Sequence, residues 1–449
     1  MSYVRSVIRA LCPLAALSVL AGAGAAPQGQ LGIAAAFGAF LAFVVPELSA
    51  QEAEAGIRLS IDDPLTVEGL VSAVLEQSPR LRAAEAAAEA ALYRIDPAGS
   101  LDDPMLSYSV APRSSDQNVD FMQRLPWPGT LRAREVAAER EAAAAGWAVN
   151  ADELALAAAA KSAYAEWYFV ARALEIHHAV QDLVDELITT AEARYAAGRA
   201  SKQDVLQAEV ERADLDNQEL ALRREQTAAL ARINALLNRA PEAALPLAAP
   251  IEVQSSIRDG ETVERLALDR HPELKRLDAE IGGAESRVTL ARKAFYPDFE
   301  LYAGYMELWD ESDKRTTLGV SINVPLNRSK REAELDRAQA EVRRAEWTLA
   351  DRRAQLLADL TRARAEVEES VEAIRLYEEK LVPLAGEYLD AAMADYQSGT
   401  GAFLNVVTAE QSSLRTELAL ERTRADYLRR LAELELWAGG DLDAALNAR

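Results

Sequence analysis

Few side chains in this sequence could hold a metal ion or carry out covalent chemistry. There are three histidines and a single cysteine, Cys12, which lies close to the N-terminus. His177 and His178 are neighbours, so on a helix their imidazoles point in different directions, whereas a shared metal site needs histidines about one turn apart. The methionines are scattered, which leaves no relay for soft metal ions. We therefore expect neither a bound metal nor a cofactor.

The sequence also lacks the local motifs of common catalytic sites. It contains no phosphate-binding glycine loop, no nucleophile elbow and no zinc-protease helix motif. Its 72 acidic residues exceed its 49 basic residues, which gives a net charge of −23. Such an acidic chain disfavours nucleic acid as a partner and suits a surface or channel that attracts cations. The sequence predicts a protein that is not an enzyme.

Residues 1–50 are interpreted as an export signal. Arg5 and Arg9 precede a long apolar run, as in a signal peptide. A second apolar run over 31–45 leaves two alternatives open, a start codon placed too far upstream or a short membrane hairpin. Lipidation of Cys12 is disfavoured because the residue before it is not small. After this segment, no stretch approaches the roughly 20 apolar residues of a spanning helix.

The remaining sequence contains one unit twice. The stretch RYAAGRASKQDVLQAE starts at Arg194, and DYQSGTGAFLNVVTAE starts at Asp395 with matching Tyr, Gly, Val, Ala and Glu. Pairs of prolines upstream match at a similar spacing. Self-similarity of this kind indicates a repeated structural unit. We predict a first repeat over 62–240 and a second over 261–440.

The sequence pattern of each repeat predicts a helix, two strands, a long helix, a break and a returning helix. Hydrophobic periodicity and the placement of Pro and Gly give the helix boundaries. A helix over 131–197 would be about 100 Å long at 1.5 Å per residue and would need partner helices. Pro383 should kink the corresponding helix of the second repeat. The predicted helices cover 65–95, 131–197 and 201–238 in the first repeat, and 261–294, 328–397 and 402–437 in the second.

Gly198 and Gly399 mark the breaks. Glycine readily adopts the left-handed conformation that ends a helix, so each break predicts the tip of a helical hairpin. Taken alone, the two hairpins would also fit a spectrin-like or other coiled-coil rod.

The segments between the helices alternate with a period of two, as strands do. Leu318, Val320, Ile322 and Val324 fall on one face, with small or polar residues on the other. Lengths near ten residues and one apolar face are typical of outer-membrane barrel strands, although a soluble hairpin packed on helices is the alternative. Four strands cannot close a barrel, so strands that meet lipid must be shared among several chains.

In this order, the motifs resemble those of the TolC-like outer-membrane efflux factor family over essentially all of 62–440. The resemblance is carried by LTVEGLVSAVLEQSPRL, by the doubled unit, by QRLPWPGTLR after the second strand and by YQSGTGAFLNVVTAEQSSL with its earlier copy. The Leu-Pro-Trp-Pro-Gly stretch at 125–129 is most similar to the branch that serves heavy-metal resistance pumps.

The resemblance implies a mainly α fold with a small β part. It implies a homotrimer in which four strands per chain form a twelve-stranded barrel in outer-membrane lipid, above a periplasmic α-helical coiled-coil barrel. It further implies a periplasmic adaptor (membrane fusion) protein and an inner-membrane RND-type pump as partners. The adaptor would dock at the hairpin tips, where Tyr195 and Tyr396 lie beside Gly198 and Gly399.

The family often carries acidic residues just after these tips, where they narrow the pore mouth. Asp204 matches one such position, and Asn405 and Thr408 occupy the equivalent positions of the second repeat, where a pair of aspartates is common. Glu209 and Glu410 are further candidates for a negative ring.

We therefore expect a passive outer-membrane duct of a tripartite system, extending into the periplasm and exporting heavy-metal cations. The alternatives are a non-conducting periplasmic or surface coiled-coil scaffold, and a duct for drugs or secreted protein.

Overall fold

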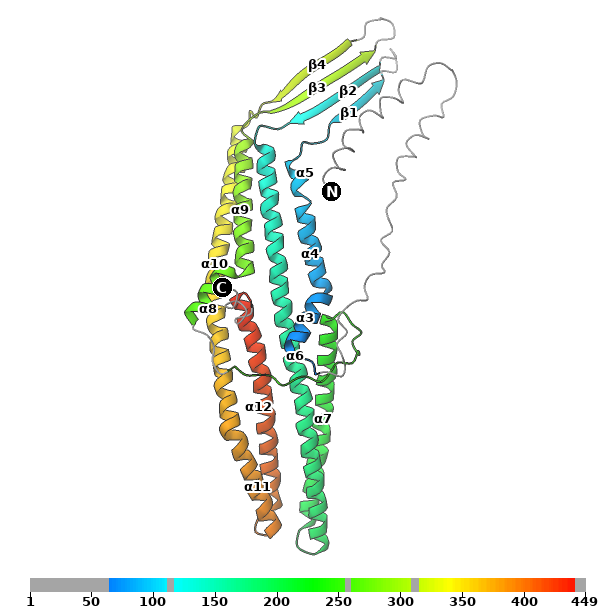
Figure 1. The fold of residues 1–449 in the computed structure, drawn as a ribbon, viewed down its shortest axis with the longest axis vertical. Coiled ribbons are helices and arrows are strands. Elements are labelled where there is room, and N and C mark those ends of the chain that lie inside the picture. Colours follow the sequence, from blue (N-terminus) through cyan, green and yellow to red (C-terminus); the bar gives the residue numbers. More distant parts are fainter. Residues whose placement is uncertain (1–63, 111–116, 255–259, 308–314, 441–449) are drawn as a thin grey trace, which may run out of the picture. The chain divides into compact units, whose positions relative to one another are not determined.

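The structure is a computed structural model that describes residues 64–110, 117–254, 260–307 and 315–440. The chain divides into a unit over Met1–Ala55 and a unit over Gly56–Arg449. The predicted export signal at 1–50, with Cys12, lies outside the described residues. In the second unit, helices run side by side with the strands at one end and the two hairpin turns at the other (Figure 1).

The first half of this unit follows the predicted order of elements. Its elements are α3 (Val67–Gln77), α4 (Pro79–Leu92), α5 (Ile95–Gly99), β1 (Met105–Val110), β2 (Gln117–Leu125), α6 (Thr130–Ala196) and α7 (Lys202–Leu236). The prediction of one helix over 65–95 is wrong. The helix breaks between Gln77 and Pro79, because a proline disfavours helical backbone at the residue before it and starts a new helix readily.

The second half repeats this order. Its elements are α8 (Gly260–Arg270), α9 (Pro272–Lys293), β3 (Asp298–Glu307), β4 (Arg315–Asn323), α10 (Arg328–Leu376), the π-helical turn η1 (Tyr377–Leu381), α11 (Val382–Ser398) and α12 (Phe403–Ala438). Pro272 divides the helix expected over 261–294, as Pro79 does in the first half. The predicted interruption at Pro383 is confirmed, since η1 widens the backbone where the ring would otherwise clash with the preceding turn.

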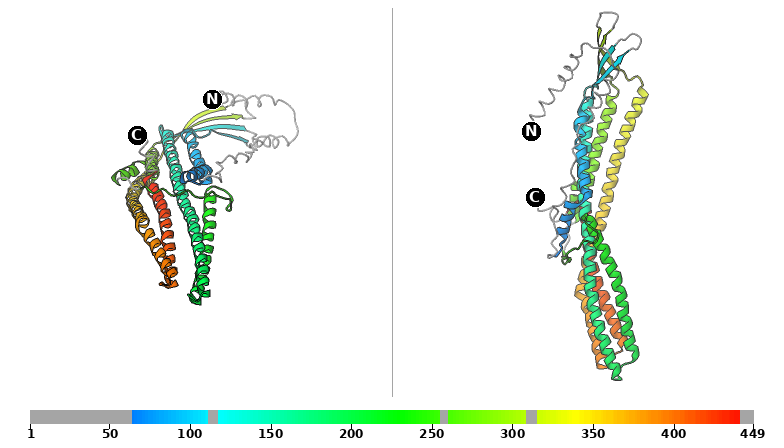
Figure 2. Two further views of the ribbon diagram at one scale, coloured as in Figure 1. Left: turned by 60° about the horizontal axis from the view of Figure 1, so that its bottom comes forward. Right: turned by 90° about the vertical axis from the view of Figure 1, so that its right-hand side faces the viewer.

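The helices pack as one layer with a consistent order. Near the strands the neighbours are α4, α6, α9 and α10, and toward the turns they are α7, α6, α12 and α11 with the lower part of α10. The two further views in Figure 2 show the same side-by-side arrangement. The 67-residue α6 therefore contacts both halves of the chain, as its length demands. None of the helices in the described part of the chain combines the length and the hydrophobicity that a membrane span requires.

The main core lies about midway along the layer, where α3, α8 and the segment around residues 245–253 pack against α6 and α12. Tyr164 of α6 is fully buried there, and its hydroxyl lies 2.8 Å from the carbonyl oxygens of both Leu65 and Ala249. Because a buried hydroxyl needs a partner, this contact fixes the two connecting segments against the long helix.

The four strands form a single antiparallel sheet in the order β1-β2-β3-β4. The central pair, β2 and β3, joins the two halves of the chain. Among the described residues, β1 and β4 each pair on one side only. The strand order matches the helix order near the sheet, so strands and helices continue one another.

The register separates an apolar face from a polar one. Leu106, Phe121, Ala303 and Leu318 lie opposite one another in a row across the sheet. The next row, on the other face, is Ser107, Asp120, Gly304 and Thr317. On this polar face, Asp120 accepts hydrogen bonds from Tyr302 and Ser107. The period-two prediction for the strands is therefore confirmed.

The Leu-Pro-Trp-Pro-Gly stretch connects the sheet to α6. The Trp127 ring stacks on Tyr296, with ring centres 4.8 Å apart, and also contacts Phe299. The backbone N–H of Trp127 donates to Asp298 at 3.2 Å, and Lys293 donates to the carbonyl of Pro128. The motif thus holds the start of α6 against the α9–β3 connection of the other half.

Candidate functional site

The two predicted glycine turns lie at the ends of the hairpins. Gly198 follows α6 with φ 69°, and Gly399 follows α11 with φ 86°, the left-handed backbone that glycine adopts at little cost. In the first turn the Arg199 amide donates to the Arg194 carbonyl, and in the second the Thr400 amide donates to the Asp395 carbonyl. We call residues 194–204 the first tip and residues 395–405 the second tip.

The tyrosines that match in the repeat have different surroundings. Tyr195 is exposed on the first tip, whereas Tyr396 is buried at the second and packs edge-to-face on Phe403. A docking surface on this chain would therefore present Tyr195 directly, while Tyr396 supports the second tip from inside.

Arg194 joins the two tips, a role that the sequence analysis missed. Its guanidinium donates to the carbonyl oxygens of Tyr396 at 2.6 Å and Gln397 at 3.1 Å, and it lies 4.5 Å from the centre of the Tyr396 ring. These carbonyls lie near the C-terminal end of α11, where a positive charge is favourable. The sequence carried a signal for this contact. Arg194 and Asp395 occupy matching positions of the repeat, so the two tips differ in charge at this position.

Asp204 lies in the first turn of α7, and its charge also acts on the second tip. Its backbone N–H donates to the Ser201 hydroxyl, which in turn donates to the Asp204 carboxylate at 2.8 Å, so the pair caps the helix. The pKa of Tyr396 is raised mainly by burial and further by the negative charge of Asp204, while Arg194 lowers it. Asp204 is half-buried, and its charge acts on Tyr396 of the second tip.

The remaining mouth candidates divide by exposure. Glu209, Asn405 and Thr408 are exposed, and the Thr408 hydroxyl donates to the carbonyl of Leu404 one turn earlier. Glu410 is only 1% exposed. The idea that Glu410 adds to a surface ring of negative charge is therefore corrected, since its carboxylate points into the packing between helices. Its repeat counterpart, Glu209, does face outward.

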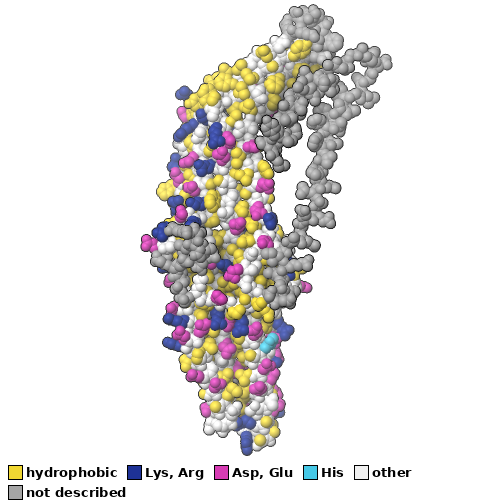
Figure 3. Space-filling model, in the orientation of Figure 1, with side chains coloured by type: hydrophobic (Ala, Val, Ile, Leu, Met, Phe, Trp, Pro, Cys, Tyr) yellow, Lys and Arg dark blue, Asp and Glu magenta, His cyan; other side chains and the backbone are white. Residues whose placement is uncertain are grey.

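The apolar face of the sheet is a second candidate surface. Leu318, Val320 and Ile322 of β4 are 79%, 61% and 56% exposed, and Val324, one residue beyond the strand, is 56% exposed. Leu106, Tyr108 and Phe121 extend this surface over β1 and β2. On the face shown in Figure 3, the sheet carries hydrophobic side chains with few charged ones, whereas charged side chains are scattered among hydrophobic ones over the helices below. Exposed apolar patches of this kind mark protein or lipid contacts.

The adjacent histidines of α6 point to different partners, as their spacing predicts. His177 is buried with Nε2 2.6 Å from the carbonyl oxygen of Leu215, whereas His178 is exposed with Nε2 3.3 Å from the Glu219 carboxylate. Over the described ranges, no group of three or more His, Cys, Asp or Glu side chains is arranged to hold a metal ion.

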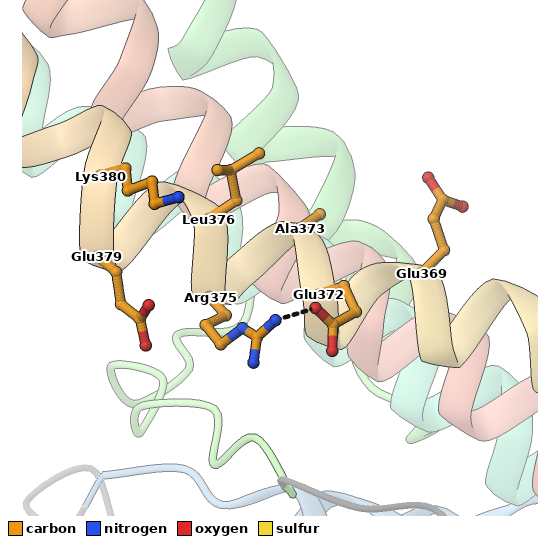
Figure 4. Close-up of a pocket in the computed structure, with 7 residues that line it drawn as sticks. All are labelled: Glu369, Glu372, Ala373, Arg375, Leu376, Glu379 and Lys380. Atoms are coloured by element: carbon orange, nitrogen blue, oxygen red, sulfur yellow. Dashed lines mark hydrogen bonds and ion pairs between the residues drawn. The ribbon is translucent and has the colours of Figure 1, made fainter.

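A shallow pocket follows one face of α10 and η1 (Figure 4). Glu372 pairs there with Arg375, and Glu369 at its edge pairs with Arg430 of α12. Charges of both signs that pair along one helix are typical of a solvated surface, and this pocket shows no convergence of groups on a ligand. It is lined by Glu369, Glu372, Ala373, Arg375, Leu376, Glu379 and Lys380.

Comparisons with known proteins agree with this architecture. The sequence profile described as outer membrane efflux protein matches residues 70–239 and 263–440, more than half of the chain. Among curated protein sequences, none matches this chain.

Several solved structures have a similar fold. The outer membrane protein VceC from Vibrio cholerae aligns with a TM-score of 0.70 at 23% identity, covering 83% of this chain and 96% of VceC. CusC, whose structures concern folding and transmembrane channel formation, aligns with a TM-score of 0.74 at 18% identity, covering 87% and 96%. The open state of the MtrE outer membrane channel from Neisseria gonorrhoeae aligns with a TM-score of 0.67 at 21% identity, covering 83% and 89%.

Replacing Arg194 by Gln should loosen the second tip. The variant keeps a polar side chain but loses charged hydrogen bonds of the kind worth about 1.5–3 kcal/mol. We expect amide hydrogen exchange over residues 395–401 to become roughly tenfold faster or more, measured by mass spectrometry. Arg199→Gln, on the exposed side of the first tip, is the matched control and should leave exchange unchanged. Equal protection in both variants would contradict the role assigned to Arg194.

Proposed function

Because this chain belongs to the outer membrane efflux protein family, we propose that it forms the trimeric outer-membrane duct of a tripartite system that exports heavy-metal cations. The protein is a passive channel of the outer membrane that reaches into the periplasm, and it is not an enzyme. The energy for export therefore comes from a partner.

The exposed apolar face of the sheet is the observation that carries this proposal. A non-conducting scaffold would bury Leu318, Val320 and Ile322 against its own helices, yet each is more than half exposed. Their neighbours across the sheet are also apolar, so the exposed surface is continuous rather than scattered. Lipid is the environment in which a face of this composition is favourable.

The unpaired edges of the sheet support a shared barrel. In lipid, unpaired backbone N–H and C=O groups cost several kcal/mol each. Within the described strands, β1 and β4 each have one neighbour, so each offers a free edge to another copy. Three copies would supply twelve strands and, through α4 and α10 at the outer positions of the layer, a closed wall of helices beneath them.

The hairpin tips are the proposed docking site for a periplasmic adaptor protein, which would link the duct to an inner-membrane RND-type pump. They lie at the end of the helices away from the sheet, where a periplasmic partner could reach them (Figure 1). Gly198 and Gly399 place little side-chain bulk there, and exposed Tyr195 offers an aromatic contact.

The proposed cargo is a metal cation. Support comes from the sequence similarity of the 125–129 stretch to the heavy-metal branch and from the net charge of −23. An acidic pathway concentrates cations and repels anions. Asp204 and Glu209 are the carboxylates proposed to act at the mouth, beside exposed Asn405 and Thr408.

Two aspartates on the apolar face of β4 should prevent membrane insertion. Val320→Asp with Ile322→Asp would place carboxylates where lipid is expected, and charges on the lipid face of a barrel destabilise it by up to a few kcal/mol each. We expect the double variant to be absent from the outer-membrane fraction after detergent extraction. Thr317→Asp with Ser321→Asp, on the opposite face of the same strand, should insert normally. Normal insertion of the first pair would refute the duct.

Bulky substitutions at the tips should abolish efflux without dissociating the trimer. Gly198→Arg with Gly399→Arg adds long cations at positions where an added Cβ meets no tight contact, although positive φ strains the backbone by roughly 1–2 kcal/mol at each residue. Native gels should show intact trimers, and export assays should show no transport. The matched pair Gly198→Asn and Gly399→Asn suits the same backbone and should retain most transport. Undiminished export by the arginine variant would mean that the adaptor docks elsewhere.

A strain that lacks this protein should lose tolerance to metals selectively. If the acidic duct carries cations, growth should fail at severalfold lower Zn²⁺ or Cd²⁺, while tolerance to lipophilic dyes and antibiotics stays within twofold. Complementation with the intact gene is the control. The reverse pattern would assign the duct to organic toxins, and unchanged tolerance to both with a missing secreted protein would assign it to secretion.

A further inference from the structure

Two buried carboxylates lie where the two hairpins meet. Glu410 on α12 is 1% exposed, and Glu211 on α7 is 7% exposed. They belong to different halves of the chain, and α7 and α12 contact each other directly. A buried carboxylate is costly unless donors or a cation compensate it, so this pair calls for an explanation.

The surroundings of Glu410 provide no compensation. Both of its carboxylate oxygens lack a hydrogen-bond donor among the described residues, while Glu211 accepts one bond, from Gln411 at 2.7 Å. Arg212, the guanidinium next along α7, is held by Asp185 and Asp216. The apolar clusters that flank this stretch of α12 draw on α6 and α11 as well, through Leu187, Val184, Ala392 and Met393.

Burial and the neighbouring charge both favour a proton on Glu410. Burial, followed by the negative charge of Glu211, raises the pKa of Glu410 to about 7. The pKa of Glu211 is also raised, mainly by burial, while the bond from Gln411 lowers it and the charge of Asp214 raises it. The charged group of α7 that acts on Glu410 is therefore Glu211. Because Glu211 is also acidic, its negative charge disfavours ionisation of Glu410.

We propose that Glu410 and Glu211 form a proton-binding site that holds the first and second hairpins together near the mouth of the duct. This inference rests on the proposed function only in naming that mouth. A protonated Glu410 is neutral and carries the O–H donor that the pair otherwise lacks. Loss of the proton leaves two buried negative charges on facing helices, which favours separation of α7 from α12.

The direction of the pH response follows from linkage. When the hairpins separate, water reaches Glu410 and its pKa returns toward the ordinary value of about 4.5. The joined state therefore keeps its proton to a higher pH than the separated state. The contact is fully favoured below about pH 4.5 and is lost progressively as the pH rises through about 7, by up to tenfold in the equilibrium constant per pH unit.

Spin labels can measure this separation without requiring transport. Gln203→Cys on α7 and Leu404→Cys on α12 are exposed positions near the two tips. In the full-length protein in detergent, double electron–electron resonance should show a short distance between the two spin labels at pH 5.5. The population at longer distances should grow at least tenfold by pH 8, and most of this growth should be complete near pH 7.

Three variants separate the proton site from other causes. Glu410→Gln keeps the shape but cannot ionise, so the short distance should persist at every pH. Glu211→Gln removes the negative charge that ionised Glu410 would meet, so the longer distance should gain less population with rising pH than in the wild type, which keeps the proposal testable if Glu410→Gln folds poorly. Glu192→Gln changes an exposed carboxylate of the first hairpin and should keep the wild-type response.

Conductance in planar bilayers distinguishes this proposal from the proposed duct. A current that rises from pH 5.5 to pH 8 in the wild type, and stays low in Glu410→Gln, would support both. Conduction together with a pH-independent inter-hairpin distance would overturn the proton site and leave the duct intact. A pH-dependent distance without conduction at any pH would overturn the duct and leave the proton site intact. A wild-type response retained by Glu410→Gln would also overturn the site.

Discussion

The sheet imposes one constraint: its apolar face is exposed, and among the described strands β1 and β4 each pair on one side only. Water solvates the edges but not the face, and lipid covers the face but cannot satisfy the edges. Both requirements are met when other copies pair with β1 and β4 while lipid covers Leu318, Val320 and Ile322. In the proposed duct, neighbouring copies and the membrane therefore complete what a single chain leaves open.

The same constraint extends into the helices, because the order of the layer is that of the sheet. β1 continues from α4 and α5, β2 leads into α6, β3 follows α9 and β4 leads into α10. Closing the sheet therefore brings α4 and α10 of neighbouring copies together. The aromatic contacts of Trp127 join the start of α6 to the α9–β3 connection, where strands and helices meet. A helix of 67 residues is stable in this setting since packing, more than intrinsic propensity, supports long helices.

At the hairpin end, polar contacts join the two halves of the chain in addition to apolar packing. Arg194 compensates the carbonyl end of α11, and Ser201, the N-cap of α7, donates to the Asp204 carboxylate, so the charges of both residues have partners. Deeper between the hairpins, Glu410 has no hydrogen-bond donor among the described residues, and Glu211 accepts a bond from the neutral Gln411. The two kinds of contact oppose each other, one joining the hairpins and one separating them when ionised. Opposing contacts of this kind suit a pair of hairpins that can be either joined or separated.

The sequence by itself determined the elements that depend on local pattern. Alternation predicted the strands, glycine predicted both turns, and Pro383 predicted the break in the second long helix. Repeat symmetry, however, treats Tyr195 and Tyr396, or Glu209 and Glu410, as equivalent. Only the tertiary structure buries one member of each pair and exposes the other, and only it brings Arg194 to α11. Burial depends on which neighbours a helix face meets, and those neighbours lie some 200 residues away in the sequence, beyond the reach of any local pattern.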